Sequence, residues 1–152
     1  MTLSCQKSDV DLPVRVAAAS DLTAAFEALK GEFERETQLR VSFSFGSTGL
    51  LARQMAEGAP FDVFAAADAE SIDALIAQGV CDGATRFVYG RGRLSLLGVT
   101  SIDNLADEKY QRIAMANPEH APYGRAAKAA IATAGLTEQL AGRLVYAENV
   151  RQ

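Results

Sequence analysis

The sequence is poor in the residues that disulfide scaffolds, metal centres and membrane spans require. Among its 152 residues it has two cysteines, Cys5 and Cys81, and a single histidine, His120. Two cysteines are too few for a disulfide framework, and they lack the spacing of metal ligands. The longest apolar runs are too short for a transmembrane helix. Composition therefore argues against all three of these features.

Positive charge is also scarce. Lysine and arginine number 15 against 19 acidic residues, the net charge is −4, and no basic run occurs. This balance argues against nucleic acid or an acidic membrane surface as the partner. A small anion stays compatible, because a local group of backbone amides can bind an anion inside a protein of negative net charge. With 49% hydrophobic residues, the chain is expected to form a globular core.

Residues 1–12 are expected to be a polar leader, either an added start or the remainder of a processed precursor. They contain no apolar stretch of the kind that a signal peptide needs. Cys5 is a candidate for lipid attachment, although Thr2-Leu3-Ser4 is a poor match to the residues that usually precede a lipidated cysteine.

The next part of the chain alternates strand-like and helix-like patterns. Strands are predicted at 14–19, 40–45 and 61–67, and helices at 20–37, 49–58 and 68–80. Asp68 is the expected N-cap of the third helix, and Gly58 and Gly79 are the expected ends of the second and third. This order predicts an α/β fold with a parallel sheet and right-handed crossovers.

The second half of the chain changes character at the stretch 86–99, RFVYGRGRLSLLGV. It predicts a strand interrupted by Gly90 and Gly92, and we interpret it as a crossing between two lobes. Beyond it we predict a helix at 101–110, a strand at 112–117, a helix at 122–135 and a strand from 143. The last helix has barely begun at Gln152, so we expect a truncated chain.

Four strand-to-helix junctions carry small or polar residues. They are Ser20-Asp21, Gly46 to Gly49, Asn117 to Gly124, and Glu148 to Val150. Ligands of open parallel sheets bind beyond the carboxyl ends of the strands. Helix N-termini at those ends present free N–H groups and a positive dipole, which suits an anion. With the serine and threonine hydroxyls, these junctions predict an anion site made of neutral donors.

Simpler interpretations exist for each residue alone. Ser20, Ser47 and Thr48 fit plain helix caps, and Pro122 with Gly124 fits an ordinary helix start. His120 is expected in a loop or at the surface rather than as a base or ligand.

Arg91 and Arg93 are expected to form solvent-exposed ion pairs, with contact to an anion as the alternative. Enzyme motifs are weak, since no phosphate-binding P-loop and no G-x-S-x-G elbow occurs. A serine hydrolase using Ser20 or Ser47 would need His120 as its base, and nothing in the sequence places it beside either serine.

Four segments of the sequence resemble the periplasmic molybdate-binding proteins of ABC importers. They are VAAASDLTAAF, FSFGSTGLLARQMAEGAPFDVFAAAD, RFVYGRGRLSLL and ANPEHAPYGRAAKAA…LVYAENVRQ. The resemblance runs from about Val14 to the C-terminus and is most specific from Phe45 to Asp68. It implies the two-lobe α/β fold of type II periplasmic binding proteins, which closes on molybdate or tungstate without catalysis or a cofactor. It also implies a membrane permease as the partner.

The resemblance also implies roles for particular residues. Ser20 falls on a serine that donates through its hydroxyl and amide, and Thr48 falls on the second loop serine, with Ser47 just before it. Tyr123 and Val150 fall where the family supplies backbone amides. These donors reach the metal only through the oxygens of the oxyanion.

By the same resemblance, residues 13–88 form a first lobe without its returning segment, and 89–152 form a partial second lobe. We therefore expect a fold that is incomplete at its C-terminus, exposed apolar faces, and association or strand exchange between copies. We expect the lone monomer to bind molybdate weakly or not at all. The expected location is the periplasm or the outer side of a membrane anchor.

Three other functions stay open at this point. They are binding of another tetrahedral oxyanion such as sulfate, a small serine hydrolase, and a cytoplasmic sensor domain of the same fold. The sensor is disfavoured because no helix-turn-helix segment is present.

Overall fold

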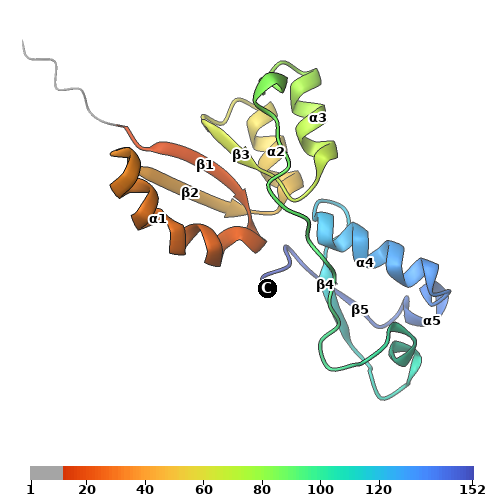
Figure 1. Cartoon of the computed structure of the whole chain (residues 1–152). Helices are drawn as coiled ribbons and strands as arrows, with labels where there is room; N and C mark the ends of the chain where they lie inside the picture. The colour runs from red at the N-terminus through yellow and green to blue at the C-terminus, as the bar shows by residue number, and fades with distance from the viewer. Residues whose placement is uncertain (1–11) are drawn as a thin grey trace, which may run out of the picture.

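The computed structural model describes residues 12–152, which form two α/β lobes joined by an extended segment (Figure 1). Each lobe has its own parallel sheet, with the strand order β2-β1-β3 in the first lobe and β4-β5 in the second. Residues 1–11 of the predicted leader, with Cys5, lie outside the described residues. The two-lobe α/β organisation expected from the sequence is confirmed.

The first lobe confirms the predicted alternation of strands and helices. Its elements are β1 (Val14–Ala19), the 3-10 helix η1 (Ser20–Leu22), α1 (Thr23–Thr37), β2 (Val41–Gly46), α2 (Thr48–Ala56), β3 (Val63–Ala65) and α3 (Ala69–Ala77). Strands β1 and β2 pair in parallel from Val14 opposite Val41 to Ala19 opposite Gly46. Because the last residues of the two strands lie opposite each other, the loops that follow them begin at the same edge of the sheet.

Strand β1 is the central strand of the first sheet, and its two faces pack into different core clusters. Val16 and Ala18 pack with Val41 and Ala65 on one face, where Phe26 of α1 joins them. Ala17 faces the opposite side, toward a cluster built by α2 and α3. A strand buried on both faces reads as a continuous apolar run, which is what residues 16–19 show after the exposed Arg15.

The second lobe is smaller. It contains η3 (Ile102–Ala106), β4 (Ile113–Ala116), α4 (Pro122–Thr133), α5 (Thr137–Leu140) and β5 (Leu144–Ala147), while η2 (Gly83–Thr85) precedes the connecting segment. Its core is a cluster of Leu105, Ile131, Leu136 and Leu140 between the 3-10 helix η3 and helices α4 and α5. Helix α5 was not predicted, because four residues are too short for a helical period to show.

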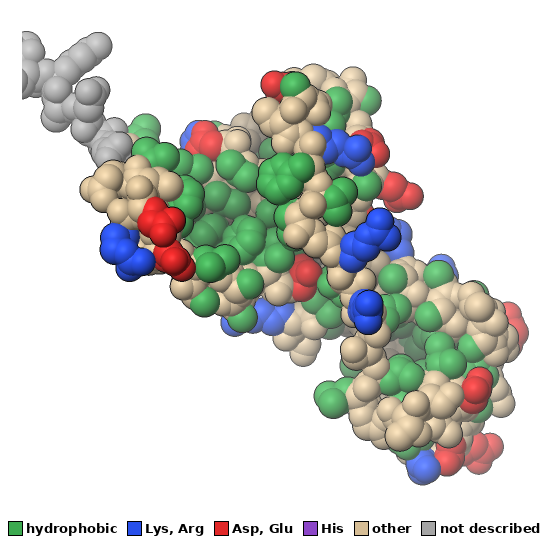
Figure 2. Space-filling view, viewed as in Figure 1, with side chains coloured by type: hydrophobic (Ala, Val, Ile, Leu, Met, Phe, Trp, Pro, Cys, Tyr) green, Lys and Arg blue, Asp and Glu red, His purple; other side chains and the backbone are tan. Residues whose placement is uncertain are grey.

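The predicted strand at 86–99 is wrong. This stretch belongs to neither sheet, although its apolar side chains fit a strand pattern. Phe87 is 77% exposed and Leu97 is 102% exposed, and Figure 2 shows apolar side chains at the surface of both lobes. A strand forms only where a neighbour accepts its hydrogen bonds, and no described strand pairs with this stretch. It is instead the extended connection between the lobes.

Several predicted boundaries also change. The predicted helix at 101–110 shortens to η3, whose first turn is capped by the Ser101 hydroxyl accepting from the Asp103 amide at 3.3 Å. The predicted strand from 143 ends at Ala147 and is followed by a turn. The caps predicted for the first lobe are confirmed, since Asp68 Oδ1 accepts from the Ser71 amide at 2.8 Å. Gly58 and Gly79 have φ values of 94° and 72°, the left-handed conformation of helix-ending glycines.

Within residues 12–152, no helix combines the length and the apolar character needed to cross a membrane.

Candidate anion-binding site

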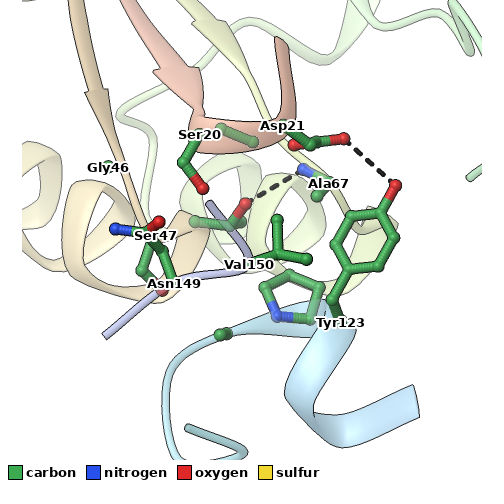
Figure 3. Close-up of a pocket in the computed structure, with 12 residues that line it drawn as sticks. Ser20, Asp21, Gly46, Ser47, Ala67, Tyr123, Asn149 and Val150 are labelled. Carbon is green, nitrogen blue, oxygen red and sulfur yellow. Dashed lines mark hydrogen bonds between the residues drawn. The ribbon is translucent and has the colours of Figure 1, made fainter. Parts of the chain in front are cut away.

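A small cavity lies between the lobes, where the strands end and the helices begin (Figure 3). The first lobe lines it with Ala19, Ser20, Asp21, Gly46, Ser47, Thr48 and Ala67, and the second with Ala121, Pro122, Tyr123, Asn149 and Val150. All five residues predicted for the site are in this set. The space open to the centre of a water molecule is about 10 Å³. It therefore suits one small ion and excludes a sugar or an amino acid.

Ser20 contributes a free hydroxyl to the cavity. It follows β1 directly, is 8% exposed, and its side chain points toward the other labelled residues in Figure 3. Its hydroxyl has no hydrogen-bond partner within the part of the chain that the structure describes. Its carbonyl accepts from Thr23 Oγ1 at 2.8 Å, which fixes the loop. The simple N-cap interpretation is wrong, because Ala19 is the residue before η1 and no side chain caps that helix.

Thr48 and Ser47 differ in whether the hydroxyl proton is available to bind a ligand. Thr48 is 1% exposed, and its Oγ1 accepts from the Ala67 amide at 3.0 Å, so its own proton stays available. Ser47 is 3% exposed, and its Oγ donates to the His120 carbonyl at 2.6 Å. Neither side chain caps α2, so the capping interpretation is wrong here too. Of this pair, Thr48 alone has a proton left to donate to a ligand.

The lining residues of the second lobe include no serine or threonine. The Tyr123 amide lies in the first turn of α4, where helical N–H groups have no intrahelical partner. Gly124 lets this turn approach β4, because a Cβ there would meet the carbonyl oxygen of Ala116. Val150 lies in the turn after β5 and is 46% exposed. That turn is shaped by Asn149 Oδ1, which accepts from the Arg151 amide at 3.0 Å.

One carboxylate, that of Asp21, is part of the cavity wall. Tyr123 Oη from the second lobe donates to Asp21 Oδ2 at 3.1 Å, which Figure 3 marks with a dashed line. Burial and the charge of Asp21 raise the pKa of the Tyr123 phenol. Burial, with Asp21 nearby, also raises the pKa of Tyr89 to about 12. The hydroxyl of Tyr123 therefore stays protonated near neutral pH and occupies a lone pair that would otherwise repel an anion.

Two further contacts between the lobes were not predicted. Arg125 forms an ion pair with Asp68, whose side chain is 17% exposed. The Gly49 amide donates to the His120 carbonyl oxygen at 2.9 Å. The sequence predicted Asp68 only as a helix cap. No pattern near Arg125 or Gly49 in the sequence indicated that either residue contacts the other lobe.

The remaining candidates are not among the residues that line the cavity. Arg91 and Arg93 do not line it, and the expectation that they form ion pairs is wrong for the described residues. His120 lies in a loop, as predicted, and its Nε2 lies 3.1 Å from the Glu148 carbonyl oxygen.

The hydroxyl of Ser47 meets the carbonyl of His120 rather than its imidazole. A carbonyl cannot take the proton of a serine nucleophile, so this contact gives no support to a hydrolase. Among residues 12–152, no group of three or more histidine, cysteine or acidic side chains could hold a metal ion.

Comparison with known proteins agrees with this architecture. Residues 14–152 match the family described as bacterial extracellular solute-binding protein. The molybdate-binding protein ModA of Azotobacter vinelandii is 36% identical over 145 residues, which is 91% of this chain and 58% of that protein. ModA of Escherichia coli K12 is 34% identical over 149 residues, with the same two shares. The chain thus spans under two thirds of the length of these relatives.

A solved structure supports the same fold. The periplasmic molybdate-binding protein of Azotobacter vinelandii superposes with a TM-score of 0.83 at 33% identity, covering 91% of this chain and 64% of that chain. The chain belongs to the family of bacterial extracellular solute-binding proteins, and it has the two-lobe α/β fold of a periplasmic molybdate-binding protein.

Proposed function

We propose that this chain binds molybdate or tungstate between its lobes, as part of a protein that supplies the membrane permease of an ABC importer outside the cytoplasm. The proposal rests on the cavity between the lobes, which is lined by residues at the carboxyl ends of strands from both lobes. The hydroxyls and amides of these residues are neutral hydrogen-bond donors. Relatives named for molybdate binding support the choice of anion. No catalytic step and no cofactor belongs to the proposal.

Four groups are proposed as donors to the oxygens of the anion. They are the hydroxyls of Ser20 and Thr48 and the amides of Tyr123 and Val150. The first two come from the first lobe and the last two from the second, so the anion is enclosed only when the lobes meet. This arrangement also underlies our proposed division into lobes at 13–88 and 89–152. Ser47 lines the same space, but its proton is engaged by His120.

Such a donor set distinguishes a bare oxyanion from a protonated one. Molybdate carries no proton near neutral pH and needs only donors, whereas hydrogen phosphate carries a proton that needs an acceptor. Asp21 is the one carboxylate of the cavity wall, it is held by the hydroxyl of Tyr123, and it is not among the four groups proposed to contact the anion. Burying an unpaired polar group costs about 1–3 kcal/mol, which disfavours hydrogen phosphate in this site.

Sulfate is the second candidate among the tetrahedral oxyanions. Sulfate, like molybdate, carries no proton near neutral pH, so the lack of an acceptor in the site does not exclude it. It differs from molybdate in size, because its oxygens lie closer to the central atom. A site whose donors are spaced for the larger anion would leave some of them out of reach of sulfate.

A calorimetric titration with molybdate, tungstate, sulfate and phosphate tests the proposal, on protein whose mass in solution is measured by light scattering. We expect heat from molybdate and tungstate, weak where the chain is a monomer and stronger where copies associate, and little from the other two. Binding of sulfate alone would replace the proposed ligand with the second candidate. No heat from any of the four anions, with a folded chain, would contradict the proposal. The measured mass also tests the expected association between copies.

A further inference from the structure

Gly49 places its backbone directly against the second lobe, one residue beyond the cavity-lining Thr48. It is the second residue of α2, and a Cβ built on it would lie 2.6 Å from the carbonyl oxygen of His120 and 3.1 Å from its Cα. Both neighbours are backbone atoms of the other lobe, which cannot rotate away as the end of a side chain does. No residue larger than glycine fits here with the lobes in this arrangement.

The carbonyl of His120 is itself held by α2. It accepts from the Gly49 amide at 2.9 Å and from Ser47 Oγ at 2.6 Å. Two donors at one oxygen fix this carbonyl at the N-terminus of the helix, where the positive end of the dipole attracts it. This contact is therefore a docking point between the lobes and does not belong to the core of either lobe.

The same segment of the second lobe holds the first lobe at two more places. Tyr123 Oη donates to Asp21 Oδ2 at 3.1 Å, and Arg125 pairs with Asp68. We call these two contacts and the docking of His120 on α2 the closure contacts. All three come from residues 120–125, and they meet three different loops of the first lobe.

The local structure of α2 gives no reason for a glycine at position 49. Glycine is among the poorest helix formers, and alanine is the best. Gly49 also has no left-handed φ that would require it. The remaining reason for a glycine here is the approach of the His120 carbonyl, which exists only while the lobes are together.

We propose that Gly49 determines whether the lobes can close. Any side chain at this position meets the His120 carbonyl and holds the second lobe away, so the amides of Tyr123 and Val150 no longer reach the cavity. The first lobe keeps its fold, because the three atoms nearest to a Cβ at position 49 all belong to the other lobe.

The variant Gly49→Ala tests this proposal, with Gly31→Ala as its matched control. Gly31 lies in α1, and a Cβ built on it meets no atom within 4 Å. Both variants replace a helical glycine by alanine, but only one places a methyl group between the lobes. A difference between them therefore reports the contact with His120 rather than helix propensity.

Closure is measured directly as a distance between the lobes. Spin labels at Glu36→Cys in the first lobe and Glu138→Cys in the second, both exposed, are used in the full chain with Cys5→Ser and Cys81→Ala. Pulsed dipolar spectroscopy then gives the distance distribution with and without added molybdate. We expect a closed population in the parent chain and in Gly31→Ala, and its loss in Gly49→Ala under both conditions.

Two results would overturn the proposal. One is a closed population in Gly49→Ala equal to that of the parent, and the other is a parent chain that stays open under every condition. The distance measurement does not depend on which anion binds, so it separates this proposal from the proposed function.

A second readout, the affinity for molybdate, rests on the proposed function. If the parent binds, Gly49→Ala should bind about 10- to 100-fold more weakly, as expected when the binding-competent state falls to a minor population. Gly31→Ala should keep the parent affinity. Equal affinities of Gly49→Ala and the parent would count against the proposal.

Discussion

The two sides of the cavity are built from different chemistry. The first lobe presents hydroxyls on short buried loops, with Thr48 only 1% and Ser20 only 8% exposed. The second lobe, by our proposal, presents the amides of Tyr123 and Val150, and Val150 is 46% exposed in the turn after β5. The hydroxyls are positioned by contacts within their own lobe, such as Thr48 Oγ1 with the Ala67 amide. The amides reach the cavity only through the closure contacts.

This difference separates recognition from closure. Changes on the first side should alter which donors the anion meets, and at Thr48 also the stability of the first lobe. Changes on the second side should alter how long the lobes stay together and leave each lobe folded. The predictions below test this separation, beginning with the largest effect.

Thr48→Val should have the largest effect, because it removes a donor and an acceptor at once. The anion loses a hydroxyl, and the half-buried Ala67 amide loses the oxygen that it contacts at 3.0 Å. We expect affinity for molybdate to fall about 10- to 100-fold and stability to fall by about 1–3 kcal/mol. Titration calorimetry and chemical denaturation measure the two effects. Thr48→Ser keeps the hydroxyl and should restore most of both, and an affinity of Thr48→Val equal to the parent would contradict the role of Thr48.

Ser20→Ala should reduce affinity without reducing stability. The hydroxyl of Ser20 has no hydrogen-bond partner among residues 12–152, so its removal breaks no bond within that part of the chain. We expect about 10-fold weaker binding of molybdate and a stability within about 0.5 kcal/mol of the parent. The same titration and denaturation experiments apply. Unchanged affinity would remove Ser20 from the site, and a large loss of stability would show that it has a structural role instead.

Arg125→Met should accelerate release of the anion while leaving its capture unchanged. The ion pair with Asp68 joins the lobes, and its arginine side chain is 38% exposed, so we expect an effect of about 1 kcal/mol. That corresponds to a dissociation rate about fivefold higher in a stopped-flow experiment. Arg53→Met is the control, since Arg53 is an exposed residue of α2 that does not line the cavity. Equal rates in the two variants would show that the ion pair does not hold the lobes together.

The smallest effect concerns alkaline pH, because Tyr89 is 49% exposed and solvent screens its interactions. Tyr89 Oη donates to the Ala66 carbonyl oxygen at 2.6 Å, and burial raises the pKa of Tyr89 to about 12 from an ordinary value of 10.0. Because the folded pKa lies above the unfolded one, this contribution to stability is complete below pH 10 and is lost as pH rises toward 12. Denaturation of the parent and Tyr89→Phe across this range should show a steeper decline in the parent. Parallel curves of stability against pH for the parent and Tyr89→Phe would contradict the raised pKa of Tyr89.

The sequence was sufficient to predict the parts of the site that depend on local pattern. The order of strands and helices placed Ser20 and Thr48 at the ends of β1 and β2, and topology brings the carboxyl ends of parallel strands to one edge. The cap at Asp68 follows from its position just before a helix. For these residues, a neighbour within a few positions along the chain determines the structure.

The parts that were missed depend on how one lobe sits on the other. Asp68 and Arg125 are 57 positions apart, and Ser47 and His120 are 73 apart. No periodicity or cap signal links such residues, because their contact follows from the orientation of two separately folded units. The strand predicted at 86–99 was wrong for a related reason. Its strand-like pattern is a local property, but a strand also needs a neighbouring strand to pair with.

The most direct test of the account is a crystal structure of the chain grown with molybdate. We predict one anion between the lobes, with oxygens at about 2.7–3.1 Å from the hydroxyls of Ser20 and Thr48 and from the amides of Tyr123 and Val150. The His120 carbonyl should remain docked on Gly49. An anion bound elsewhere, or one that contacts a single lobe while the lobes stand apart, would contradict the account.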